Sequence, residues 1–229
     1  MRNRNYFYLL ARGIALVFIL TGSIATAKTP ESTAVAKSQT TVAEAMVNGF
    51  RSAKFSMTEN DVYRAISIDF KTPRDQVVRS VHPTEKTVTL GIKTKDLVPE
   101  SGTAHIFYIF GYQSQKLMQV NIVWGDPVDP TADPQGVVNT ANQLRDHFIK
   151  EGYQRDGMAI NARLPDESVL VFRGKDRLGR MVILLLKSSM TSAEKEKATA
   201  GSVNHMSLRL SYIEKPEAPD IFKIKKGDF

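Results

Sequence analysis

A segment rich in proline and aspartate near the middle of the chain most constrains the fold. Residues 125–136 read GDPVDPTADPQG, with three prolines and three aspartates in twelve residues. Proline removes a backbone donor and is excluded from sheet interiors, so this segment ends one structural unit before another begins. Asp133 is placed to cap a helix whose first residue is Pro134. Residues 126–134, called the seam below, therefore divide the chain in two.

The first part, residues 41–125, begins with two patterns typical of short amphipathic helices. In residues 41–50, Thr41 and Glu44 have the spacing of a capping pair, and apolar residues recur at every fourth position. Thr58 and Asp61 repeat this spacing before a similar apolar stripe that ends at Phe70. We expect two short helices that form an αα-hairpin.

The period then changes to that of β-strands. Residues 87–92, 103–110 and 116–125 alternate or are rich in β-branched and aromatic side chains, which predicts an antiparallel meander of three or four strands. Successive side chains of a strand point to opposite faces. Both faces of strand 103–110 are largely apolar, so we expect it to lie centrally, with His105, Phe107 and Ile109 on one face and Ile106, Tyr108 and Phe110 on the other.

The second part, residues 135–214, repeats the order of helix and then strands. Apolar residues Val137, Ala141, Leu144 and Phe148 form one helical stripe, and strands are predicted at 168–174, 180–188 and 203–214. In the last strand Arg209 lies on the polar face. The predicted fold class is α+β, with two helix-plus-antiparallel-sheet units in tandem. The alternative is one continuous antiparallel sheet with helices on one face.

The N-terminus has the pattern of a secretory signal peptide. Arg2 and Arg4 precede a short apolar core, and Ala25-Thr26-Ala27 is a typical cleavage site. The apolar run is shorter than the roughly 20 residues of a spanning helix. We therefore expect residues 1–27 to be removed, residues 28–40 to form a flexible linker, and the mature protein to be periplasmic. A lipid anchor needs a thiol, and the chain contains no cysteine.

The charge of the mature chain argues against nucleic acid as a partner. Loss of Arg2, Arg4 and Arg12 lowers the count of Lys and Arg from 31 to 28 against 24 Asp and Glu, and the formal net charge from +7 to +4. This excess is too mild for a typical nucleic-acid binder. Part of it lies in the basic tail, residues 215–229, which allows at most a peripheral contact with a membrane.

The sequence contains no recognisable catalytic motif, so no catalytic residue is predicted. The aspartates of the seam do not have the spacing of a calcium loop, and neither a metal site nor a cofactor is expected. The hairpin sequence FRGKDRLGR gathers four cations that are suited to hold an anion, and a solvated turn explains them equally well. The candidate ligand-binding residues are Arg173, Lys175, Arg177 and Arg180. Tyr108 and Tyr112 are the candidate interaction residues.

Two stretches resemble the SmpA/OmlA (BamE) family of small outer-membrane lipoproteins. FSMTENDVYRAI, residues 55–66, is similar to the motif that opens a helix in that family. TAHIFYIF and LMQVNIVWG, within residues 103–125, resemble its paired strands. The chain has Ser23 where the family has its lipidated cysteine, and Ser56 where the family usually has glycine. The resemblance implies a non-enzymatic envelope scaffold, and tandem copies of such units resemble the β-lactamase-inhibitor-protein fold.

These observations predict an exported, non-enzymatic accessory protein that interacts with another protein of the bacterial envelope. The alternative is a periplasmic binding module for a small anionic or envelope-derived ligand. The first function depends on apolar or aromatic anchors, and the second depends on the cations of the hairpin.

Overall fold

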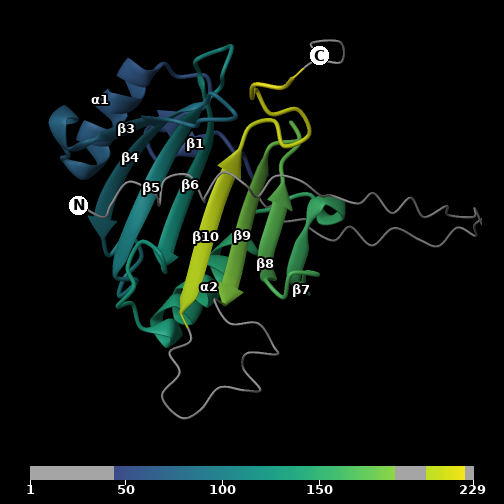
Figure 1. Cartoon of the computed structure of the whole chain (residues 1–229). Coiled ribbons are helices and arrows are strands. Elements are labelled where there is room, and N and C mark those ends of the chain that lie inside the picture. Colours follow the sequence, from purple (N-terminus) through teal and green to yellow (C-terminus); the bar gives the residue numbers. More distant parts are fainter. Residues whose placement is uncertain (1–43, 189–204, 225–229) are drawn as a thin grey trace, which may run out of the picture.

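The computed structural model describes residues 44–188 and 205–224 (Figure 1). The predicted signal peptide and linker, and the last five residues of the predicted tail, lie outside this range. The first half contains β1 (Gly49–Phe50), β2 (Ala53–Lys54), α1 (Glu59–Phe70), the 3-10 helix η1 (Arg74–Gln76), β3 (Val78–Val81), β4 (Val88–Lys95), β5 (Thr103–Phe110) and β6 (Leu117–Gly125). The second half contains α2 (Pro134–Phe148), η2 (Arg155–Gly157), β7 (Ala159–Arg163), β8 (Val169–Lys175), β9 (Met181–Ser188) and β10 (Met206–Ile213).

Eight strands form one antiparallel sheet in the order β3-β4-β5-β6-β10-β9-β8-β7. Each half of the chain supplies a helix and four neighbouring strands, and the halves meet where β6 pairs with β10. Gly125 ends β6 with a positive φ of 72°, and a Cβ there would collide with the main-chain carbonyl of Met206. The α+β prediction is confirmed, and the strands form the single continuous sheet that was given as the alternative.

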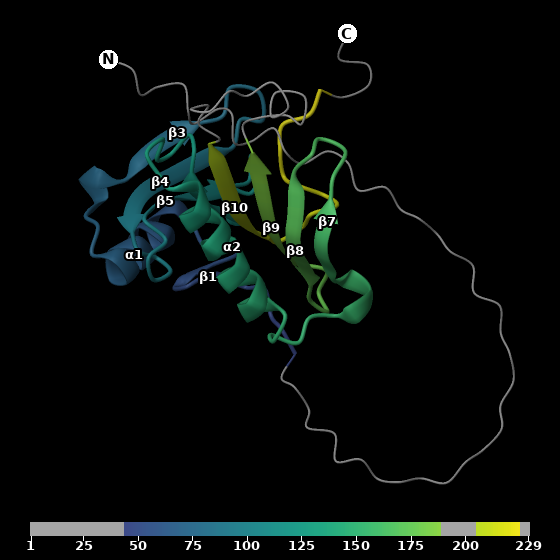
Figure 2. The same cartoon turned by 90° about the horizontal axis from the view of Figure 1, so that it is seen from below.

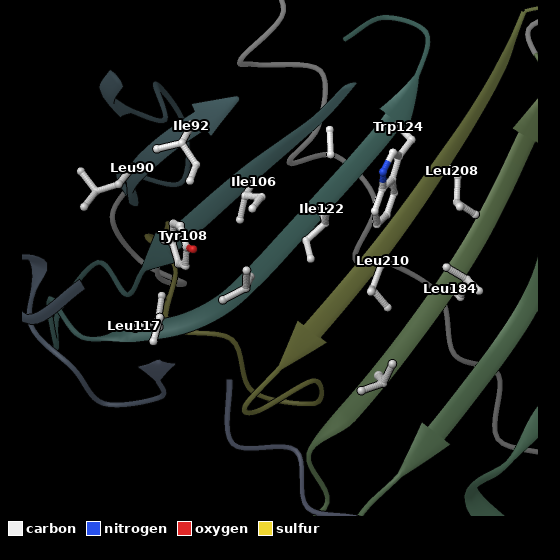
Figure 3. Packing of buried hydrophobic residues seen from close by; sticks show 14 of the residues in the cluster. Leu90, Ile92, Ile106, Tyr108, Leu117, Ile122, Trp124, Leu184, Leu208 and Leu210 are labelled. Atoms are coloured by element: carbon white, nitrogen blue, oxygen red, sulfur yellow. The ribbon is translucent and has the colours of Figure 1, made fainter. Parts of the chain in front are cut away.

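Both α-helices lie on the same side of the sheet, together with β1 (Figure 2). The core fills the space between these layers, where labelled side chains from β4 to β10 point to one side (Figure 3). On β5 this face carries Ile106, Tyr108 and Phe110, as the alternation predicts. Trp124 at the end of β6 is 1% exposed and donates from its indole Nε1 to Ser101 Oγ at 3.2 Å.

The predicted caps fix the starts of both helices. Thr58 accepts from the Asp61 backbone N–H, and the Asp61 carboxylate accepts from the Thr58 N–H at 3.0 Å, which is a complete capping box. Asp133 accepts from the backbone N–H groups of Gln135 and Gly136, and Pro134 occupies the first turn. Each side chain satisfies donors that a helix N-terminus leaves without intrahelical partners.

The helix predicted over residues 41–50 is wrong for the described residues, because 44–48 are not helical and Gly49 begins β1. Tertiary partners take the backbone donors that a helix would have used. Ala45 N donates to the Gly152 carbonyl at 3.2 Å, and Val47 N donates to the Asp176 carboxylate at 3.0 Å. The αα-hairpin is therefore absent from the described chain.

The second half has one strand more than the three predicted. The additional strand, β7, forms one edge of the sheet, and the short β3 forms the other. Neither edge strand has a long apolar pattern. Ile160 on β7 and Val78 on β3 are 42% and 50% exposed.

Candidate functional site

The predicted cationic hairpin connects β8 to β9, and the chain itself supplies partners for two of its arginines. Arg177 Nε lies 2.5 Å from a Glu44 carboxylate oxygen. Arg180 donates to the Asn48 side chain and to the Val47 carbonyl, and its guanidinium lies 5.8 Å from the centre of the Phe55 ring. These contacts hold residues 44–48 against the hairpin.

A buried carboxylate at the centre of the turn strengthens this attachment. Asp176 is 4% exposed and accepts from the backbone N–H groups of Val47, Leu178 and Arg180 at 2.9–3.0 Å. The sequence pattern did not predict a role for Asp176. The feature that could have indicated this role is an aspartate within a basic turn. Its carboxylate accepts hydrogen bonds from backbone N–H groups and does not pair with the neighbouring cations.

Arg173 and Lys175 lie on β8 and are half-buried. Their direct cross-strand neighbours on β9 are Ile183 and Met181. The Nε of Arg173 is buried and has no hydrogen-bond partner. The four predicted cations are thus divided between two roles, since two anchor the N-terminal segment and two lie on the sheet.

The two predicted interaction tyrosines have different surroundings. Tyr108 is fully buried on the helix side of β5, so the prediction that it contacts a partner is wrong. Its hydroxyl has no hydrogen-bond partner, and burial raises its pKa far above the usual range. Tyr112 is 39% exposed and packs edge to face on Phe222, with 5.5 Å between ring centres. Tyr112 thus contacts the predicted C-terminal tail.

The face of the sheet opposite the two helices, called the helix-free face below, carries Arg173 and Lys175 together with two further cations, Lys93 and Arg209. It consists of three rows of direct cross-strand neighbours. Together these rows run across β4, β5, β6, β10, β9 and β8. The first row contains Lys93, His105, Val123, Arg209 and Leu185. The second contains Phe107, Asn121, Ser211, Ile183 and Arg173, and the third contains Ile109, Gln119, Ile213, Met181 and Lys175.

No carboxylate belongs to these three rows. Acidic groups occur at the margins of the face, where Asp166 lies 3.8 Å from Lys187 and the charge of Lys93 helps to lower the pKa of Asp129. The main cause of the low pKa of Asp129 is a hydrogen bond from Thr131. The rows combine cations with aliphatic side chains and with amides such as Gln119, which donates to Asn121 at 2.8 Å.

His105 is a half-buried imidazole in the first row. Burial, and secondly the charge of Lys93, lower its pKa to about 4. The imidazole is therefore neutral at pH 7. Its Nε2 is buried without a hydrogen-bond partner, and its ring packs edge to face on Phe107 at 5.8 Å. A neutral imidazole has one donor and one acceptor nitrogen, so His105 keeps hydrogen-bonding capacity for another group.

Arg209 lies in the same row, on the opposite side of Val123 from His105. Its guanidinium is largely removed from water, and this burial lowers its pKa. Among residues 44–188 and 205–224 it forms no ion pair. Buried charges in proteins are normally paired, because an unpaired charge in a low-dielectric site is costly. This arrangement is suited to bind an oxyanion.

Arg209 was predicted to lie on a polar strand face, but the first row was not predicted. The alternation of the last strand gave the orientation of Arg209. The alignment of Arg209 with His105 and Lys93 required the pairing of β6 with β10, which joins segments far apart in the chain. Within the described ranges, no three His, Asp or Glu side chains gather in a way that would hold a metal ion.

Comparison with known proteins gives no similar molecule. No protein-family model matches the chain, and neither the curated proteins nor the solved structures contain a match. Neither of the described α-helices has the length and apolar composition needed to cross a bilayer.

Proposed function

We propose that this chain is an exported, non-enzymatic accessory protein of the bacterial envelope, and that it binds another envelope protein through the helix-free face. The observation that carries the proposal is the first row of that face. Arg209 lies there between Val123 and Leu185 and has no ion pair within the described residues, and the exposed Lys93 lies in the same row, which contains no carboxylate. Cations set among apolar side chains are typical of the buried centre of an interface.

The sequence supports export to the periplasm. Arg2 and Arg4, the apolar core and the Ala25-Thr26-Ala27 site have the order of a secretory signal. The resemblance of residues 55–66 and 103–125 to the SmpA/OmlA (BamE) family supports an envelope scaffold. Protein beginning at Lys28 in the fraction released by osmotic shock is the expected result. Full-length protein in washed membranes would contradict export.

The size of the helix-free face favours a protein over a small molecule. Its three rows cross six strands, so they span roughly 25 Å at the usual spacing between strands. Small ligands are typically enclosed in clefts, whereas the exposed and half-buried side chains of these rows are spread over the width of the sheet, which suits contact with a protein.

The second candidate function is binding of a small anion. The observation that favours it is the guanidinium of Arg209, which is largely removed from water and has no ion pair among the described residues. An Arg side chain binds a single carboxylate or phosphate through two parallel hydrogen bonds.

Site-directed cross-linking tests the proposal, and the absence of cysteine from the chain makes the experiment specific. Thr89→Cys places a thiol beside Ile109 on the helix-free face, and Ile68→Cys places one on α1, where Ile68 is 63% exposed. Each variant is expressed in the envelope, and its thiol is then labelled with a photoreactive group. After illumination we expect a defined protein adduct from position 89 and none from position 68. An adduct from position 68 alone would contradict the proposed surface. Native mass spectrometry that finds only a bound small anion would favour the second candidate.

A further inference from the structure

We propose that the partner contacts the helix-free face with an acidic segment, in which one carboxylate binds Arg209 and a second binds Lys93. This inference rests on the proposed function and specifies the chemistry of the partner. The aliphatic side chains of the same segment pack on the half-buried Leu185, which is a neighbour of Arg209 in its row, because Val123 on the other side of Arg209 is 1% exposed.

The position of Arg209 in the sheet supports the first contact, in which a carboxylate of the partner binds its guanidinium. It lies on β10, between β6 and β9 in the middle of the sheet, and its neighbours across the strands are aliphatic. These neighbours give the guanidinium no acceptor, and the described chain supplies no carboxylate to it. A carboxylate from a partner would form two hydrogen bonds with the planar guanidinium and would neutralise a charge already removed from much of its water.

The spacing of the row requires a second carboxylate. His105 and Arg209 are separated by the strand that contains Val123, so their backbones are about 10 Å apart. The two oxygens of one carboxylate lie much closer together than this and cannot contact both residues directly. Lys93 lies one strand beyond His105 and is exposed, so a second carboxylate pairs with its ammonium group, whereas the Nε2 of His105 is a buried atom that a partner does not reach.

The composition of the face favours a protein segment over a lipid surface. Arg209 and His105 are half-buried among aliphatic and amide side chains, whereas the lysines Lys93 and Lys187 are exposed near the margin. Anionic headgroups bind mainly to clusters of exposed basic side chains. A peptide that alternates acidic and aliphatic residues pairs with the cations and packs on the half-buried Leu185 beside Arg209.

Fluorescence anisotropy with a labelled peptide of alternating glutamate and leucine tests this inference directly. We expect the peptide to bind the mature chain, with an affinity that decreases as salt concentration rises. Arg209→Met retains the apolar stem and removes the charge, and should weaken binding by about 10-fold or more. Arg209→Lys should give an intermediate affinity because it loses the bidentate geometry. Arg177→Gln, outside the three rows, should bind like the wild type.

Other outcomes of the same experiment would overturn the inference. Equal binding of a peptide with glutamine in place of glutamate would show that carboxylates are not recognised, and absence of peptide binding would contradict the acidic partner outright. Binding of phosphatidylglycerol vesicles or inorganic phosphate that depends on Arg209, without binding of the peptide, would assign the row to a lipid or a small anion. Far-UV circular dichroism and thermal melting verify that each variant is folded. A position-89 adduct that persists when Arg209→Met is added to Thr89→Cys would reject this inference alone, whereas absence of the adduct from Thr89→Cys with Arg209 intact would reject the proposed function.

Discussion

Leu208 on β10 and Trp124 on β6 are direct cross-strand neighbours and join the two halves of the sheet. Both side chains are almost fully buried and belong to the core that also contains residues of α1 and α2. The hydrogen bonds between β6 and β10 continue the sheet across this point, so the two halves share one core and one set of backbone partners.

The shared core predicts that the two halves unfold together. Leu208→Ala should lower the free energy of unfolding by about 2–5 kcal/mol, because it leaves a cavity beside Trp124. In urea, Trp124 fluorescence and far-UV circular dichroism should report one coincident transition in both proteins. Leu178→Ala is the control, since Leu178 is 68% exposed in a turn. Separate transitions for the two signals would show that the halves fold independently.

Removal of the Tyr108 hydroxyl should not destabilise the protein. This hydroxyl is buried and has no hydrogen-bond partner, so the folded state loses its hydration without compensation. We expect Tyr108→Phe to leave the free energy of unfolding unchanged or to raise it by about 1 kcal/mol. Tyr108→Ala should cost about 3–5 kcal/mol, because the aromatic ring fills the core. A loss above about 1 kcal/mol in Tyr108→Phe would reveal a hydrogen bond at this hydroxyl.

His105 should make stability depend on pH under mildly acidic conditions. Its pKa is about 4 in the folded protein, chiefly through burial, against about 6.5 in an unfolded chain. Between these values the unfolded state binds more protons, so the free energy of unfolding falls as pH falls from 6.5 to 4. His105 has no such effect above pH 7. Because the ring is partly exposed, we expect a contribution of about 1–2 kcal/mol.

Chemical denaturation of His105→Gln at a series of pH values measures this contribution. Stability of the variant relative to the wild type should increase steadily from neutral pH to pH 4. A constant difference between the two proteins over this range would contradict neutral burial of the imidazole.

Asp176 should hold residues 44–48 on the β8–β9 hairpin. An amide has only one accepting oxygen, so Asp176→Asn leaves at least one of three buried N–H groups without its partner. We expect a cost of about 1–3 kcal/mol and faster hydrogen exchange at the amide of Val47. Asp156→Asn, in the exposed η2, should change stability by less than about 0.5 kcal/mol. Unchanged exchange at Val47 would mean that other contacts hold this segment.

Local sequence patterns predicted the elements that depend on neighbouring residues. The capping box at Thr58 and Asp61 and the cap at Asp133 were predicted because each acts within one helical turn. The faces of β5 and β10 were predicted because alternation follows from strand geometry alone. The α+β class followed from these patterns.

Features that depend on distant partners were not predicted. Residues 44–50 have helical periodicity, but Asp176 and Gly152 supply partners to their backbone from the second half of the chain. The candidate site depends on the same kind of contact, since His105 and Arg209 share a row only through the strand that contains Val123. The pairing of strands that lie this far apart in the sequence is decided by the packing of the whole sheet, so it leaves no local pattern in the sequence.

The order of the strands has a consequence for how the chain folds as it is made. β10 follows every other described strand in the sequence, yet it lies in the middle of the sheet between β6 and β9 (Figure 1). Until β10 is available, two inner edges with unpaired backbone groups are left open, and the core between the halves lacks Leu208 and Leu210. Completion of the sheet therefore waits for the end of synthesis. A ribosome-bound chain that lacks this strand presents unpaired β-edges, which are prone to aggregate.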